Sequence, residues 1–202
     1  MGKMNLLKGS WDGKVGETVG AKWKNKKTIR TYTKPSNPNT QAQQNVRSAF
    51  KTITSFVALF ADQIRYKTAL DVSGMSVRNA IIKLNKSMIE ANNVDLKDLL
   101  ISKGGLQKPI SFSAEKDESS NAVKVTWTKP TATNFTDEAE MVVVAVDAET
   151  QVIDVFEALA SAGTATGTVS FAGATDVQVY GYYLDKRGNA KVASNSVEST
   201  IA

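Results

Sequence analysis

The chain has 202 residues and contains neither cysteine nor histidine. Without cysteine it forms no disulfides, thiolate metal sites or thiol nucleophiles, and without histidine it has no imidazole for acid–base chemistry. The lack of cysteine fits a reducing cytoplasm and an exposed viral or bacterial surface equally well. Only carboxylate chemistry remains, so we expect a non-enzymatic protein with no cofactor and no metal.

The sequence also has no run of about 20 apolar residues, the length needed to span a bilayer. Its start, MGKMNLLKGSWDGKVG, lacks the apolar core and the small-residue cleavage site of a signal peptide. We therefore expect no membrane partner and a location in the bacterial cytoplasm or, as part of an assembly, in a virion.

Charge is unevenly distributed along the chain. Residues 1–108 contain 19 Lys or Arg and 7 Asp or Glu, a net charge of +12, whereas residues 109–202 contain 6 and 13, a net charge of −7. The Gly104-Gly105 pair and Pro109 lie at this reversal and are typical of a linker. We therefore predict a basic domain at 1–108 and an acidic domain at 109–202.

The first segment, residues 5–36, is rich in glycine and then alternates apolar and polar residues on both sides of a KNKK turn, which predicts a β-hairpin. The cations could bind nucleic-acid phosphates while Trp23 stacks on a base. Alternatively, Trp23 belongs to a half-buried face and the lysines are solvated. The candidate binding residues of this hairpin are Lys22, Trp23, Lys24, Lys26, Lys27 and Arg30.

The next segment, KPSNPNTQAQQNVRSAF, leads into an amphipathic helix. Apolar residues recur every three or four positions at Val46, Phe50, Ile53, Val57, Phe60 and Ile64. Thr40 and Gln43 have the spacing of a capping box, which explains part of the motif. Gln44 and Arg47 are not explained by capping; they either tether the glycine-rich arm or contact a partner. Gln43, Gln44 and Arg47 are therefore further candidate binding residues.

A second helix is predicted by the same spacing at Val77, Ile81, Leu84 and Met88, and the two helices would form an αα-hairpin. The segment 95–103 could be a short helix capped by Asp95 or a strand. The acidic residues Asp137, Glu138 and Glu140 lack the ligand spacing of a calcium loop and indicate a solvated loop.

From Ile110 onward about seven short β-rich runs alternate with turn residues, which is typical of a β-sandwich. The fold class is therefore α+β: a β-hairpin and an αα-hairpin, then a seven-stranded β-sandwich. The runs AVKVTWTKP and VQVYGYYLDKRGNAKVASNSVEST resemble a fibronectin type III domain, and this resemblance implies that the sandwich is immunoglobulin-like. It also implies that Trp127 packs in the core beside Tyr180 or Tyr182.

The motif VGAKWKNKKTIRTYTKPSNPNTQAQQNVRSAF, followed by a sandwich, is similar to a family of uncharacterised proteins from Bacteroidota and their phages. The resemblance points to a virion or mobile-element context. Our leading hypothesis is a structural protein of a bacteriophage or phage-like particle, with other particle proteins or further copies of itself as partners. Two alternatives stay open: a cytoplasmic nucleic-acid-binding protein that uses the basic half, and a surface or carbohydrate-binding module built on the sandwich.

Overall fold

The computed structural model describes residues 3–5, 10–23, 26–34, 36–70, 74–91, 93–131, 135–187 and 190–201. The chain divides into two compact units, Met1–Thr40 and Gln41–Ala202, so the boundary lies at residue 40 and not at residue 108 as expected. No helix in the described ranges is long and apolar enough to cross a membrane.

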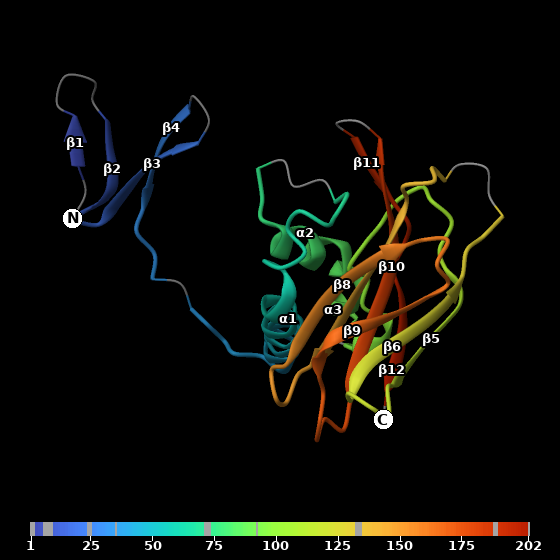
Figure 1. Ribbon diagram of the computed structural model, residues 1–202. Coiled ribbons are helices and arrows are strands. Elements are labelled where there is room, and N and C mark those ends of the chain that lie inside the picture. The colour runs from blue at the N-terminus through green and yellow to red at the C-terminus, as the bar shows by residue number, and fades with distance from the viewer. Residues whose placement is uncertain are drawn as a thin grey trace. The chain divides into compact units, whose positions relative to one another are not determined.

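The N-terminal unit is a sheet of four antiparallel strands in sequence order (Figure 1). Its strands are β1 (Lys3–Asn5), β2 (Ser10–Val15), β3 (Thr18–Trp23) and β4 (Lys26–Thr31). The turn from β2 to β3 contains Gly16 with φ of 60°, a left-handed conformation that glycine adopts without steric cost. The sequence indicated turns at these glycines but not the strand β2.

The second unit begins with α1 (Gln41–Phe60), followed by α2 (Val77–Leu84), α3 (Lys86–Glu90) and the short 3-10 helix η2 (Leu96–Asp98). Asn85 separates α2 from α3, where one continuous helix was expected. Its buried amide donates to the carbonyl oxygens of Ile81 and Leu100, both at 2.8 Å, and accepts from Leu100 N–H at 2.9 Å. The interruption therefore serves to attach the helices to residues 99–101.

Two antiparallel sheets complete this unit. One has the order β5-β6-β9; the other has the order β11-β10-β7-β8, with β12 also paired to β10. The strands are β5 (Ile110–Lys116), β6 (Ala122–Thr128), β7 (Glu140–Asp147), β8 (Ile153–Leu159), β9 (Thr164–Ser170), β10 (Val177–Arg187), β11 (Ala190–Ala193) and β12 (Val197–Ile201). The chain is thus of mixed α+β class with antiparallel sheets, as expected.

The two sheets face each other across one apolar cluster, as in a β-sandwich. Trp127 is buried there, and its indole N–H donates to the carbonyl oxygen of Ala160 at 2.9 Å. Tyr183 shares this cluster. Tyr180 and Tyr182 belong to the other face of β10, so the expectation that one of them accompanies Trp127 is wrong. Alternation along a strand sends residues 180 and 182 to the opposite side from residue 183.

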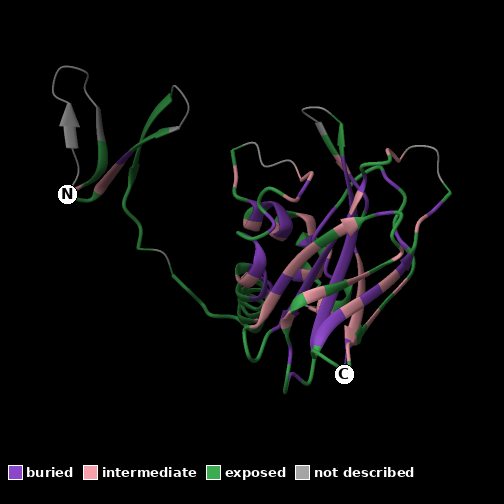
Figure 2. Cartoon of the chain, viewed as in Figure 1, coloured by how far each residue is buried: buried purple, intermediate pink, exposed green. Residues whose placement is uncertain are grey.

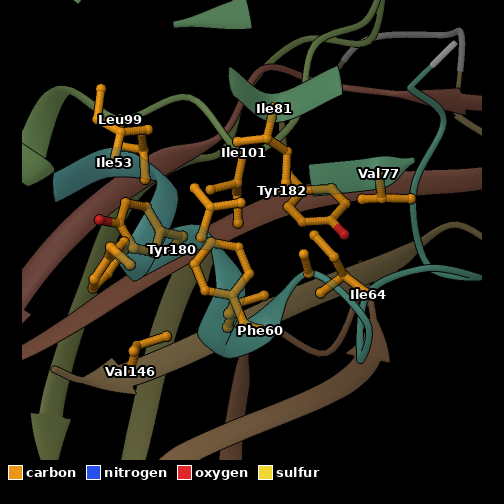
Figure 3. Packing of buried hydrophobic residues seen from close by; sticks show 14 of the residues in the cluster. Ile53, Phe60, Ile64, Val77, Ile81, Leu99, Ile101, Val146, Tyr180 and Tyr182 are labelled. Carbon is orange, nitrogen blue, oxygen red and sulfur yellow. The ribbon is translucent and has the colours of Figure 1, made fainter. Parts of the chain in front are cut away.

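A second apolar cluster lies between the larger sheet and the helices (Figure 3). Phe60 packs near Tyr180, with ring centroids 6.5 Å apart. The hydroxyls of Tyr180 and Tyr182 donate to the carbonyl oxygens of Leu96 and Lys67 in the helical layer. Strands β7 and β10 are consequently buried on both faces (Figure 2). The helices and the sandwich share a core, which is why no boundary falls at residue 108.

Residues 101–104, between the helices and β5, contact residues 193–196 near β11 and β12. Ile101 N–H donates to the Ser196 hydroxyl at 3.0 Å, and the Ser102 hydroxyl donates to the Ser194 carbonyl at 2.8 Å. A Cβ atom added at Gly104 would lie 1.8 Å from the Ala193 carbonyl oxygen. Gly104, one of the two glycines that indicated a linker, therefore lies where two backbone segments approach closely.

Candidate functional site

The apolar stripe of α1 extends beyond the core that it helps to form. Ile53, Val57 and Phe60 are 0% exposed, whereas Val46 and Phe50 are 44% and 47% exposed. The exposed residues occupy the first half of the helix, which is green in Figure 2. All five were predicted as one stripe, but only its second half packs against the protein. The first half is an apolar surface on a rigid element.

A shallow depression of about 390 Å³ lies on this surface, lined by Ala42, Gln43, Val46 and Arg47. Two of the predicted binding residues, Gln43 and Arg47, thus flank exposed apolar side chains, and Gln44 is also exposed on the same helix. We call Ala42, Gln43, Val46, Arg47 and Phe50 the α1 surface. The capping role of Thr40 and Gln43 stays a prediction.

The charge of α1 restricts what this surface can bind. The helix contains Arg47 and Lys51 and no Asp or Glu from Gln41 to Phe60. A second basic surface would be repelled, and an acidic or neutral one would be accepted. The α1 surface therefore combines apolar contact area with positive charge at its rim.

The other predicted binding residues belong to the N-terminal sheet. Lys22 on β3 is exposed, as are Lys26, Lys27 and Arg30 on β4. Trp23 ends β3, but its side chain and the whole of Lys24 lie outside the described residues. Every described side chain of β4 is exposed, so this strand lacks the buried face that a half-buried hairpin requires. The two groups of predicted residues occupy different units of the chain.

The sequence did not single out the buried carboxylates, and the contacts of these groups are structural. Asp185 accepts hydrogen bonds from Thr136 N–H at 3.2 Å, from the Thr136 hydroxyl at 2.5 Å and from Arg187 Nε at 3.0 Å. Burial alone would raise the pKa of Asp185, but these hydrogen bonds outweigh it and place the pKa below its ordinary value. Asp154 accepts from the backbone N–H groups of Thr168 and Val169 and so links β8 to β9.

The carboxylates of the described residues are the remaining candidates for a metal site. Among the described residues, no three Asp or Glu side chains gather in a way that could hold a metal ion. Asp137 and Glu138 are exposed, and Glu140 pairs with Lys186 at 2.7 Å. On the sandwich side of β10, burial raises the pKa of the Tyr183 phenol to about 12. The contacts of these groups are accounted for by the fold, and the α1 surface is the candidate site because it brings together predicted binding residues and exposed apolar side chains.

The fold and the α1 surface define a class: a β-sandwich protein with an attached helical layer and an exposed apolar contact area. Residues 9–198 match a family model described as "Family of unknown function (DUF6266)". Because the match covers most of the chain, the protein belongs to this family. No curated protein matches it.

Proposed function

We propose that the protein is a non-enzymatic structural component of a bacteriophage or phage-like particle and assembles through protein–protein contacts at the α1 surface. The observation that carries this proposal is the stripe of α1, which passes from complete burial at Ile53 to 44% and 47% exposure at Val46 and Phe50. Exposed apolar residues that continue a core stripe are costly in an isolated protein and are typical of interaction surfaces.

The partner we propose is acidic, because α1 carries cations and no anions along its length. Residues 109–202 of a neighbouring copy, with a net charge of 6 − 13 = −7, have the required sign. Other particle proteins with acidic surfaces would serve equally. Attraction of this kind orients two subunits before the apolar residues come into contact.

We further propose that residues 109–202 form a fibronectin type III-like, immunoglobulin-like sandwich of seven strands. Support comes from the strand order, in which β5-β6-β9 faces β8-β7-β10 and the last strand is divided into β11 and β12 on the same edge of β10. Counting β11 and β12 as one interrupted strand gives the seven strands of this fold. The fold supplies a rigid support and no chemistry of its own.

The test is the mass of the protein in solution by light scattering, over a range of concentrations. Changing Val46→Asp and Phe50→Asp together should lower the mass of the assembly, because both residues are exposed and a carboxylate there would be desolvated in the contact. The matched control is Leu159→Asp on β8, an apolar residue that is 54% exposed and lies outside the α1 surface.

Two results would contradict the proposal. One is a wild-type protein that stays monomeric at all concentrations and is missing from purified particles of its source when these are analysed by mass spectrometry. The other is an equal decrease of mass in the control, which would show that the contact is not specific to α1.

A further inference from the structure

Strands β3 (Thr18–Trp23) and β4 (Lys26–Thr31), which we call the β3–β4 ribbon, lie within the most one-sidedly charged stretch of the sequence. From Thr18 to Ala61 there are eight Lys or Arg and no Asp or Glu. Half of these cations are described on the ribbon, at Lys22, Lys26, Lys27 and Arg30, and all four are exposed. No anion of the ribbon's own sequence neutralises them.

The ribbon presents cations on both faces. Lys22 and Lys27 are directly opposite each other across β3 and β4, so their side chains share one face. Arg30 is three residues from Lys27 on β4, so its side chain points to the other face of the ribbon. Lys26, four residues from Arg30 on the same strand, shares the face of Arg30. Lys14 of β2 lies on the same face as Arg30, because both residues are directly opposite Val19 of β3.

Neither face is covered within this unit. Among the described residues of 12–40, no side chain is fully buried, Gly20 being the one buried residue, and the apolar Ile29 is 53% exposed. The direct opposition of Lys22 and Lys27 is unfavourable in the sheet alone. It becomes favourable when a bound anion lies near both ammonium groups. The ribbon thus has the exposed cations of an anion-binding element, and it lacks the buried apolar side chains of a strand pair that packs in a core.

We propose that the β3–β4 ribbon binds the phosphate backbone of double-stranded DNA from within a groove. A flat acidic protein surface would contact one face of the ribbon and leave the cations of the other unused. A groove has phosphates along both walls, and the major groove of B-DNA, about 12 Å wide, admits a two-stranded β-ribbon. Among the described residues β2 pairs with β3 only at Thr18–Gly20, whereas β4 pairs with β3 as far as Trp23, so the part of the ribbon that carries Lys22, Lys26 and Lys27 has two strands. Phosphate contacts carry no sequence information, so the binding is independent of sequence.

This activity goes beyond the proposed function, because it uses the N-terminal unit and not the α1 surface. The test is fluorescence anisotropy of the full chain with a labelled mixed-sequence DNA duplex, from about 50 to 200 mM salt, a range over which phosphate contacts strongly alter affinity. The test variant changes Lys22, Lys26, Lys27 and Arg30 to Gln. The matched control makes the same change of charge at four exposed lysines of the second unit, Lys83, Lys97, Lys103 and Lys108.

The wild-type protein should bind the duplex with an affinity that falls as salt rises. For each phosphate that the ribbon variant no longer neutralises, affinity should fall about eightfold at 0.1 M salt and the log–log salt slope should become shallower by about 0.9. The control should change far less. A variant with Lys22, Lys26 and Lys27 changed to Arg keeps the charges and should bind, which separates an effect of charge from an effect on folding.

Several results would overturn the proposal. They are an absence of binding at low salt, an equal decrease of affinity in the control variant, and equal affinity for single-stranded DNA of the same length. Equal affinity for polyglutamate would indicate an acidic protein partner for the ribbon and would also overturn it. The mass of the assembly, which tests the α1 surface, is independent of each of these outcomes.

Discussion

The shared core of helices and sandwich can be tested by cutting the chain at two places. The fragment 41–202 keeps the helical layer, and the fragment 109–202 removes it. We expect the first fragment to fold and the second not to fold. The reason is that removal of the helices uncovers one face of the larger sheet, which is buried on both faces in the intact chain.

The size of the effect follows from the residues that lose their cover. Six side chains of β7 and β10 are 0% exposed and belong to the cluster formed with the helices: Val142, Val144, Val146, Tyr180, Tyr182 and Leu184. Exposing each one costs about 1.5–3 kcal/mol, or about 9–18 kcal/mol for six. This is an upper bound, because unfolded chains already bury part of such surface. It is of the same size as the roughly 5–15 kcal/mol by which domains are typically stable, so the loss is large enough to unfold the fragment.

Urea denaturation followed by fluorescence is a suitable assay. Trp127 is the only tryptophan in residues 41–202, so in both fragments the signal reports the sandwich core. The fragment 41–202 should show a cooperative transition and the fragment 109–202 should show none. A cooperative transition of 109–202 with the midpoint of 41–202 would refute the reasoning and place the domain boundary at residue 108.

Two further predictions concern buried or half-buried carboxylates and can be checked by thermal denaturation as a function of pH. Burial raises the pKa of Glu198, and nearby Asp95 and Asp176 add to the shift. The folded protein therefore loses stability as the pH rises through this pKa and the carboxyl group ionises. Glu198→Gln should be more stable than wild type at pH 7 and equal to it at low pH. The pKa of Asp185 is shifted the opposite way, so its contribution is present at neutral pH and is lost as pH falls below the ordinary range. Asp185→Asn should cost about 1–3 kcal/mol at pH 7, the cost of disrupting buried hydrogen bonds to a charged group, and less in acid. A pH-independent difference in either variant would contradict the assigned cause.

Much of the fold was accessible from local patterns. The four-three spacing predicted α1, but the predicted stripe continued to Ile64 whereas the helix ends at Phe60; Ile64 is buried in the turns that follow. The β-rich runs after Ile110 coincide with strands, including QVIDVFEAL, which forms β8. Trp127 was correctly predicted in the core. These features depend on residues a few positions apart, and such residues leave a periodic trace in the sequence.

The arrangement of the parts depended on contacts between distant residues. The run EMVVVAVD is apolar without alternation, a pattern typical of strands buried on both faces, but it does not say which element covers the second face. Nothing local identifies Ser196 as the partner of Ile101, 95 residues away. For the same reason the apolar stripe on α1 could be predicted from the sequence, but it could not be predicted that Ile53 is buried and that Val46 and Phe50 are exposed.

The position of the covering helices has a consequence for synthesis of the chain on the ribosome. Phe60 is complete long before Tyr180, the tyrosine against which it packs. At translation rates of about 5–20 residues per second, the intervening 120 or so residues take roughly 6–24 s. During that time β7 and β8 can begin to cover α1, but β10 is missing from the shared core, and the hydrogen bonds to Ser194 and Ser196 form later still. The core of the second unit is therefore completed only after β10 and residues 194–196 have been made, and until then its apolar side chains are open to non-native contacts.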